Sequence, residues 1–249
     1  MCIRDRAEQA GRISANTRYL EPRLVEYAER LVATFPAELD RIVFTCTGSE
    51  SNDLALRIAR LVSGNEGVIV SAYAYHGTSA AAAEVSPNLG DAVKLSPSVR
   101  MVRLPGVAGV TPDKAAAFFE AEVRGAIYDL QRRGIGVAAL LVDSIFSSDG
   151  VHVDPPGFIA GAVAAVREAG GLFIADEVQP GFGRTGAHMW GFERHDVAPD
   201  LATLGKPMGN GFPIGAVVGR QAPMDRFGAT ARYSLSLIHI SEPTRLLSI

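Results

Sequence analysis

The sequence has little of several features that would define a class of protein. Only two cysteines, Cys2 and Cys46, occur in 249 residues, too few for a disulfide framework. The sequence has 24 basic and 27 acidic residues, so it has no excess of positive charge that would indicate binding to nucleic acid or to an anionic membrane. No apolar run is long enough to span a membrane, and no secretory signal is visible. We therefore expect a cytoplasmic protein that binds neither nucleic acid nor membrane.

The composition is that of one large globular domain, with 47% hydrophobic and 20% charged residues. The two ends fit poorly with the chain between them. Residues 1–6 and 234–249 resemble translated sequencing-adaptor read-through and are left out of the fold prediction. We expect residues 7–233 to be an internal piece of a longer protein.

Short apolar runs alternate with helical patterns along this piece. Ser49 or Ser51 is expected to cap the first of these helices, and Cys46 is expected to lie in the core of the preceding strand. Pro112 is expected to open a long helix, and residues 157–169 form another. The expected strands are residues 41–47, 67–72, 136–143, 171–177, 200–205 and 214–219. This order predicts an α/β fold with a mainly parallel sheet sandwiched by helices.

Polar clusters follow five of the expected strands. They read "TGSESN", "YAYHG", "DSIFSSDG", "DEVQPGFGRTG" and "LGKPMGNG" along the chain. In open α/β sheets, ligands bind beyond the carboxyl ends of the strands. The five clusters therefore predict one ligand site at that edge.

Three of the clusters carry residues that suggest chemistry. Gly48 and Ser49 begin a helix, so they form either a phosphate cradle or an ordinary capped helix start. The spacing there matches neither the P-loop nor the dinucleotide fingerprint, which favours a small phosphate monoester. Lys206 is either an imine-forming amine or a loop cation paired with an acid. Asp176 ends a buried strand, where a charge is costly unless it is paired.

One cofactor suits this combination of groups, namely pyridoxal phosphate. Its aldehyde would take Lys206, and its phosphate would take the helix start at Ser49. Its protonated ring nitrogen would supply the pair that Asp176 needs. An aromatic ring, Tyr75, stands in the second cluster and would cover the pyridine.

The segments "TGSESN", "YHGT", "DEVQPGFGRTG" and "LGKPMGNGFPIGAVV" closely resemble the class III pyridoxal-phosphate aminotransferases. The resemblance covers nearly all of residues 7–233, and Lys206 follows Asp176 by 206 − 176 = 30 residues, as the family pattern expects. It implies the large cofactor-binding domain of fold type I, with the smaller C-terminal domain absent. It also implies a homodimer that moves an amino group from an amine or amino acid to a keto acid.

The resemblance implies a role for each cofactor-binding residue. Gly48 and Ser49 would hold the phosphate through backbone N–H groups and the Ser49 hydroxyl. Tyr75 would stack on the ring, and His76 and Gly77 would shape that wall.

The resemblance also implies the catalytic groups. Asp176 would bind the ring nitrogen, and Gln179 would lie near the ring hydroxyl. Lys206 would be the Schiff-base lysine and then the base that moves the proton. Glu177 is expected to make a structural hydrogen bond. A partner-chain threonine would be expected just beyond Tyr233, so we expect the 249-residue chain alone to be inactive.

One segment departs from the family pattern. "DSIFSS", which begins at Asp143, stands where a Glu-Pro-x-Gln segment is usual. This departure puts the family's amino-acid substrate rules in question, and amine or ω-amino substrates stay open. His152, His188 and His195 have no metal-ligand spacing, and no metal is expected. Two alternatives remain. One is the same fold and cofactor with an aminomutase, racemase, decarboxylase or phospho-lyase reaction, and the other is a non-enzymatic α/β binding module.

Overall fold

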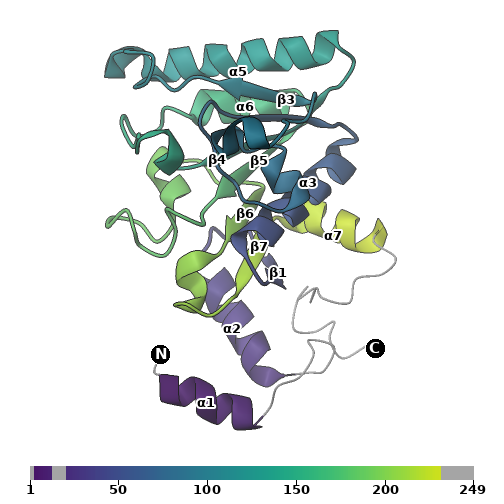
Figure 1. Ribbon diagram of the computed structural model, residues 1–249, viewed down its shortest axis with the longest axis vertical. Helices are drawn as coiled ribbons and strands as arrows, with labels where there is room; N and C mark the ends of the chain where they lie inside the picture. The colour runs from purple at the N-terminus through teal and green to yellow at the C-terminus, as the bar shows by residue number, and fades with distance from the viewer. Residues whose placement is uncertain (1–2, 13–20, 231–249) are drawn as a thin grey trace.

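The structure, a computed structural model, describes residues 3–12 and 21–230 (Figure 1). Its described part contains one sheet of seven strands in the order β1-β7-β6-β5-β4-β2-β3. The strands are β1 (Arg41–Thr45), β2 (Gly67–Ser71), β3 (Val99–Val102), β4 (Val137–Asp143), β5 (Leu172–Asp176), β6 (Leu201–Leu204) and β7 (Gly215–Gly219). Neighbours from β3 to β6 are parallel, whereas β7 is antiparallel to both β6 and β1. The predicted α/β fold with a mainly parallel sheet is confirmed.

Helices cover both faces of the sheet. The α-helices are α1 (Ile3–Arg12), α2 (Pro22–Val32), α3 (Gly48–Ser63), α4 (Ala80–Ala83), α5 (Ala115–Arg132), α6 (Ala160–Glu168) and α7 (Gln221–Thr230). The 3-10 turns are η1 (Pro87–Ala92), η2 (Pro112–Lys114), η3 (Ser147–Asp149), η4 (Gly191–His195) and η5 (Lys206–Gly209). Residues of α2, α5 and α6 pack in one core with one face of the sheet, and residues of α3 and α7 pack on the other (Figure 1).

Strand β4 shows why the apolar runs become central strands. Its first six residues are buried, with Leu140 and Val142 facing one core and Ala139 and Leu141 facing the other. Burying each large aliphatic side chain contributes roughly 1.5–3 kcal/mol, so a strand covered on both faces must be apolar at every position.

The turn between β1 and α3 differs from expectation. Strand β1 ends at Thr45, and the Thr47 hydroxyl, rather than Ser49 or Ser51, caps α3 by accepting from the Glu50 N–H at 3.1 Å. The Glu50 carboxylate in turn accepts from the backbone N–H of Cys46 at 2.7 Å. This reciprocal capping leaves Cys46 outside the strand and exposed, so its expected core position is wrong.

Strand direction brings the polar clusters together. Because β1 is antiparallel to β7, and β7 is antiparallel to β6, β1 points the same way as the parallel strands. The carboxyl ends of β1, β2, β4, β5 and β6 therefore lie at one edge, and each is followed by one of the five clusters. In register, Asp143 of β4 stands beside Asp176 of β5, and Thr203 of β6 stands on its other side.

The two ends of the chain are described only in part. Helix α1 includes residues 3–6, and the Arg6 guanidinium donates to the backbone oxygens of Gly209 and Asn210 at 3.1 and 2.8 Å. Residues 231–249, including the position expected for the partner-chain threonine, lie outside the described residues, and the boundaries 7–233 stay a prediction. Within residues 3–12 and 21–230, no helix has both the length and the apolarity for a membrane crossing.

Candidate active site

A cavity of about 210 Å³ opens at the carboxyl edge of the sheet. It also touches Asn52 and Ser148, which sequence reasoning did not single out. Its walls include every residue predicted to bind the cofactor: Gly48, Ser49, Tyr75, His76, Asp176, Gln179 and Lys206. The strand order thus brings together residues that lie up to 158 positions apart in the chain, from Gly48 to Lys206.

One end of the cavity is a cradle of backbone groups. Helix α3 begins there, and the Ser49 hydroxyl accepts from the Thr78 N–H at 3.1 Å. Gly77 has φ of +133°, and a Cβ at this position would lie 2.8 Å from the Cα of Ser49 and collide with its hydroxyl. At Gly48, a Cβ would lie 2.8 Å from a methyl group of Val178. The glycines let two loops meet around the helix N-terminus, whose free N–H groups suit a phosphate.

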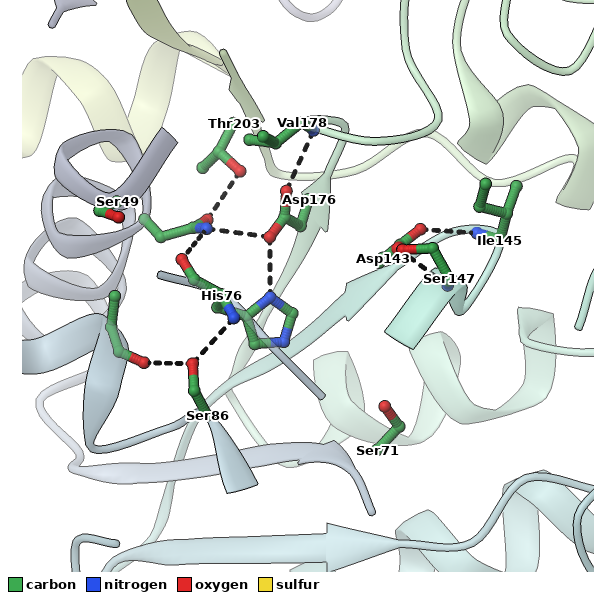
Figure 2. A network of polar contacts seen from close by, with 12 residues as sticks. Ser49, Ser71, His76, Ser86, Asp143, Ile145, Ser147, Asp176, Val178 and Thr203 are labelled. Atoms are coloured by element: carbon green, nitrogen blue, oxygen red, sulfur yellow. Dashed lines mark hydrogen bonds and ion pairs between the residues drawn. The ribbon is translucent and has the colours of Figure 1, made fainter. Parts of the chain in front are cut away.

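Asp176 lies at the centre of a buried polar network (Figure 2). Its Oδ2 accepts from Asn52 Nδ2 at 2.9 Å and lies 2.7 Å from His76 Nδ1, and its Oδ1 accepts from the Val178 N–H at 3.0 Å. Its side chain keeps 6% of its exposure. A carboxylate has about four acceptor positions, so three contacts leave about one free.

No lysine or arginine in the described ranges pairs with this carboxylate, and the His76 ring is one of its hydrogen-bond partners there. The cavity that Asp176 lines therefore suits a cationic ligand group such as a protonated ring nitrogen. The Asp176 carboxylate suits the ring nitrogen of the predicted cofactor, and the helix start at Gly48 and Ser49 suits its phosphate.

Lys206 follows β6 and also lines the cavity. It is exposed and has φ of 30°, a conformation rare for a residue with a side chain. It makes no hydrogen bond or ion pair with the described residues, so the alternative of a loop cation paired with an acid finds no support there. Its amine is left available to a ligand in the cavity.

Tyr75 and Gln179 complete the walls that were predicted. Tyr75 is 39% exposed, so its ring is open to a ligand instead of being packed in the core. Gln179 is half-buried at the turn after β5. The structure places both beside the cavity, and their roles stay as predicted from the resemblance.

Glu177 is fully buried and follows Asp176 directly in the chain. It accepts from the Ser144 hydroxyl at 2.6 Å and from the N–H groups of Gly191 and Phe192 at 2.7 and 3.0 Å. Burial raises the pKa of Glu177 to about 7, against the lowering effect of these bonds. The expected structural hydrogen bond is confirmed, and the carboxyl anchors η4 beneath the turn after β5.

Asp143 contributes a second carboxyl to the cavity. It accepts from the N–H groups of Ile145 and Ser147, both at 3.0 Å, and from the Ser147 hydroxyl (Figure 2). Burial, and then the negative charge of Asp176, raise the pKa of Asp143. The departure from the family pattern therefore forms a self-capped turn that keeps a carboxyl beside Asp176.

No group of three or more metal-ligating side chains occurs within the ranges that the structure describes. His195 serves the fold instead. Its Nε2 lies 2.9 Å from the backbone oxygen of Ser144, and its Nδ1 accepts from the Gly157 N–H at 3.2 Å. Burial lowers the pKa of His195, which favours the neutral ring.

The known proteins that resemble this chain in sequence and in structure point to one family. The profile of the class-III aminotransferases matches residues 5–233. A Drosophila melanogaster alanine–glyoxylate aminotransferase 2-like protein is 40% identical over 92% of this chain and 48% of its own length. A phospholyase from Arthrobacter, solved with phosphoethanolamine, is 45% identical with a TM-score of 0.87, over 92% of this chain and 55% of that one.

A taurine:2-oxoglutarate aminotransferase from Bifidobacterium kashiwanohense, solved with pyridoxal phosphate and glutamate, is 28% identical with a TM-score of 0.80. The match covers 92% of this chain and 54% of that one. The chain thus spans about half the length of the relatives it matches. It belongs to the class-III aminotransferases, a family of pyridoxal-phosphate enzymes of fold type I.

Proposed function

We propose that the full-length protein is a pyridoxal-phosphate-dependent transaminase that moves an amino group from an amine or amino acid to a keto acid. One observation carries this proposal, namely the single cavity that gathers Lys206, Asp176, Ser49 and Tyr75. When bound, pyridoxal phosphate supplies an electron sink that stabilises negative charge on the carbon that bears the amine.

The chain's own groups hold that cofactor at both ends. The N–H groups at Gly48 and Ser49, together with the Ser49 hydroxyl, would bind its phosphate. Tyr75 would cover one face of its ring, and Gln179 would lie near the ring hydroxyl. Asp176 would accept from the ring nitrogen and favour its protonated form, because a neighbouring carboxylate stabilises a cation.

This proposal gives Lys206 two roles. Its Nζ would hold the cofactor through the aldehyde carbon. The same Nζ would be the base that moves the proton of the amine-bearing carbon. Its exposed position at the cavity supports both roles, since the amine has no competing partner in the described structure.

The test is an acceptor screen on the full-length protein loaded with pyridoxal phosphate. A transaminase should convert an amine donor through many turnovers only when a keto acid is supplied. Without the keto acid, conversion should stop at one equivalent of donor per site. Continuous conversion without any keto acid would contradict the proposed reaction. A protein that shows no absorbance band of bound cofactor would favour the binding-module alternative.

A phospho-lyase is the second candidate, favoured by the 45% identity with the Arthrobacter phospholyase. Both reactions begin with removal of the same proton, and loss of phosphate from the neighbouring carbon then replaces amino transfer. Phosphoethanolamine without a keto acid distinguishes them. A phospho-lyase should release inorganic phosphate, ammonia and acetaldehyde continuously, whereas a transaminase should release none of them catalytically.

We also propose that the full-length protein is a cytoplasmic homodimer. The low cysteine content supports the compartment, and the family resemblance supports the dimer. Light scattering coupled to size exclusion should give twice the mass of the full-length chain. A monomer that retains full activity would contradict the dimer.

A further inference from the structure

We propose that Asn52 is a positioning residue that sets the orientation and acceptor capacity of Asp176, an inference that rests on the proposed function because it concerns the same cavity. Asn52 lies on the first turns of α3 and is 1% exposed. It lines the cavity without belonging to the residues that the family resemblance assigned.

Every hydrogen-bonding group of the Asn52 side chain is used. Its Nδ2 donates to Asp176 Oδ2 at 2.9 Å and to the backbone oxygen of His76 at 2.7 Å. Its Oδ1 accepts from the Thr203 hydroxyl at 2.7 Å. An amide has two N–H donors and one carbonyl oxygen, so these bonds satisfy each of its hydrogens and its oxygen.

This pattern permits only one orientation of the amide. If the amide group of Asn52 were reversed, its oxygen would face two acceptors, the Asp176 carboxylate and the His76 carbonyl. The amide oxygen would then repel these two acceptor oxygens, and the buried acceptors would lack donors. Thr203 stands beside Asp176 in the register of β5 and β6, so its hydroxyl fixes the orientation from the adjacent strand (Figure 2).

Asn52 also holds the neighbouring loop. The backbone oxygen of His76 accepts from Asn52, and the backbone N–H of His76 donates to the Ser86 hydroxyl at 2.8 Å. With its backbone held on both sides, the buried His76 ring places Nδ1 2.7 Å from Asp176. Loss of Asn52 therefore removes one donor to Asp176 directly and loosens the support of a second.

The consequence for the cofactor follows from the donors. A carboxylate that accepts more hydrogen bonds holds a proton less tightly. The Asn52 donor thus stabilises the negative charge of the Asp176 carboxylate, which would in turn favour a protonated ring nitrogen. It also directs the remaining acceptor position of the carboxylate into the cavity. Without Asn52, the carboxylate would have one donor fewer and could turn away from the ring nitrogen.

The experiment compares variants of the full-length protein. Asn52→Ala removes the donor, and Thr203→Val removes only the hydroxyl that orients Asn52. Ser51→Ala is the matched control, because the Ser51 hydroxyl is buried on the same helix and bonds Thr45 and the Leu204 backbone oxygen without touching Asp176. The measurements are kcat, KM, the affinity of the cofactor-free protein for pyridoxal phosphate, and the pH titration of the bound cofactor's absorbance.

Asn52→Ala should lower kcat by about 10- to 100-fold, the range expected for one hydrogen bond to a charged group, with a smaller change in KM. Its cofactor should bind more weakly and should lose its ring proton at lower pH. Thr203→Val should change the same quantities in the same direction, and the double variant should be no worse than Asn52→Ala, because Thr203 acts through Asn52. Ser51→Ala should lower thermal stability alone.

An unchanged absorbance titration in Asn52→Ala would overturn the proposal, as would additive effects in the double variant. If Asn52→Ala does not fold, Thr203→Val decides by the same absorbance titration. A wild-type protein that binds pyridoxal phosphate but converts no amine would contradict the proposed function instead. In that case cofactor affinity and absorbance still decide the role of Asn52.

Discussion

The buried carboxyl of Glu177 makes the stability of this protein depend on pH. Its pKa is about 7 in the folded chain, against 4.5 for the solvent-exposed glutamate of an unfolded chain. A folded-state pKa above the unfolded one gives stability that is fully present below pH 4.5 and is lost as the pH rises through 7. The difference corresponds to about 3 kcal/mol of unfolding free energy.

The test compares the wild-type protein with Glu177→Gln. In the variant, an amide nitrogen at the Oε2 position would face the Gly191 N–H, which costs about 1–3 kcal/mol at every pH. The wild type should therefore lose up to about 3 kcal/mol relative to the variant between pH 5 and pH 8. Denaturant unfolding of both proteins across this range measures the difference.

The comparison isolates Glu177 from other titrating groups. Burial lowers the pKa of His195, so that histidine costs stability as the pH falls below its usual value, but it does so equally in both proteins. Parallel pH profiles for the wild type and the variant would refute the assignment. A wild-type protein that gained stability relative to the variant between pH 5 and pH 8 would reverse its sign.

Three further perturbations test the cavity in the full-length protein. Asp176→Asn should lower kcat by about 1000-fold, the value of one close ion pair at an effective dielectric constant of about 20, with little change in KM. Steady-state kinetics measures both, and an unchanged kcat contradicts the role. Lys206→Ala should abolish turnover. In the wild type, borohydride reduction should attach the cofactor to the peptide that contains Lys206, and a label on any other lysine contradicts the assignment. Gly77→Ala should weaken cofactor binding by about tenfold, because its new methyl group would collide with Ser49. The control Gly64→Ala has a strained φ of +71° but open space around it, so it should lower only the stability of the fold. Equal cofactor dissociation constants for the two variants would show that the contact with Ser49 is unimportant.

The apolar runs and the spacing of polar clusters were enough to predict the sheet and most of the candidate site. Strands buried on both faces must be continuously apolar, so segments such as β4 can be predicted from the sequence. Strand β3 was not predicted, because two of its four residues are partly or fully exposed at the edge of the sheet. The cap at Thr47 and the exposure of Cys46 were also missed, since both depend on where β1 stops.

The sequence alone determined which residue types the candidate site contains: a lysine, an aspartate, an aromatic ring and a glycine-bounded helix start. Only the tertiary structure decided how they are held. Asn52 meets Asp176 across 124 residues of chain and Thr203 across 151. No local pattern encodes those contacts, because hydrogen bonds within a turn act between near neighbours in sequence. The order and direction of β5 and β6 beneath α3 create them, and that order follows from packing two apolar cores around one sheet.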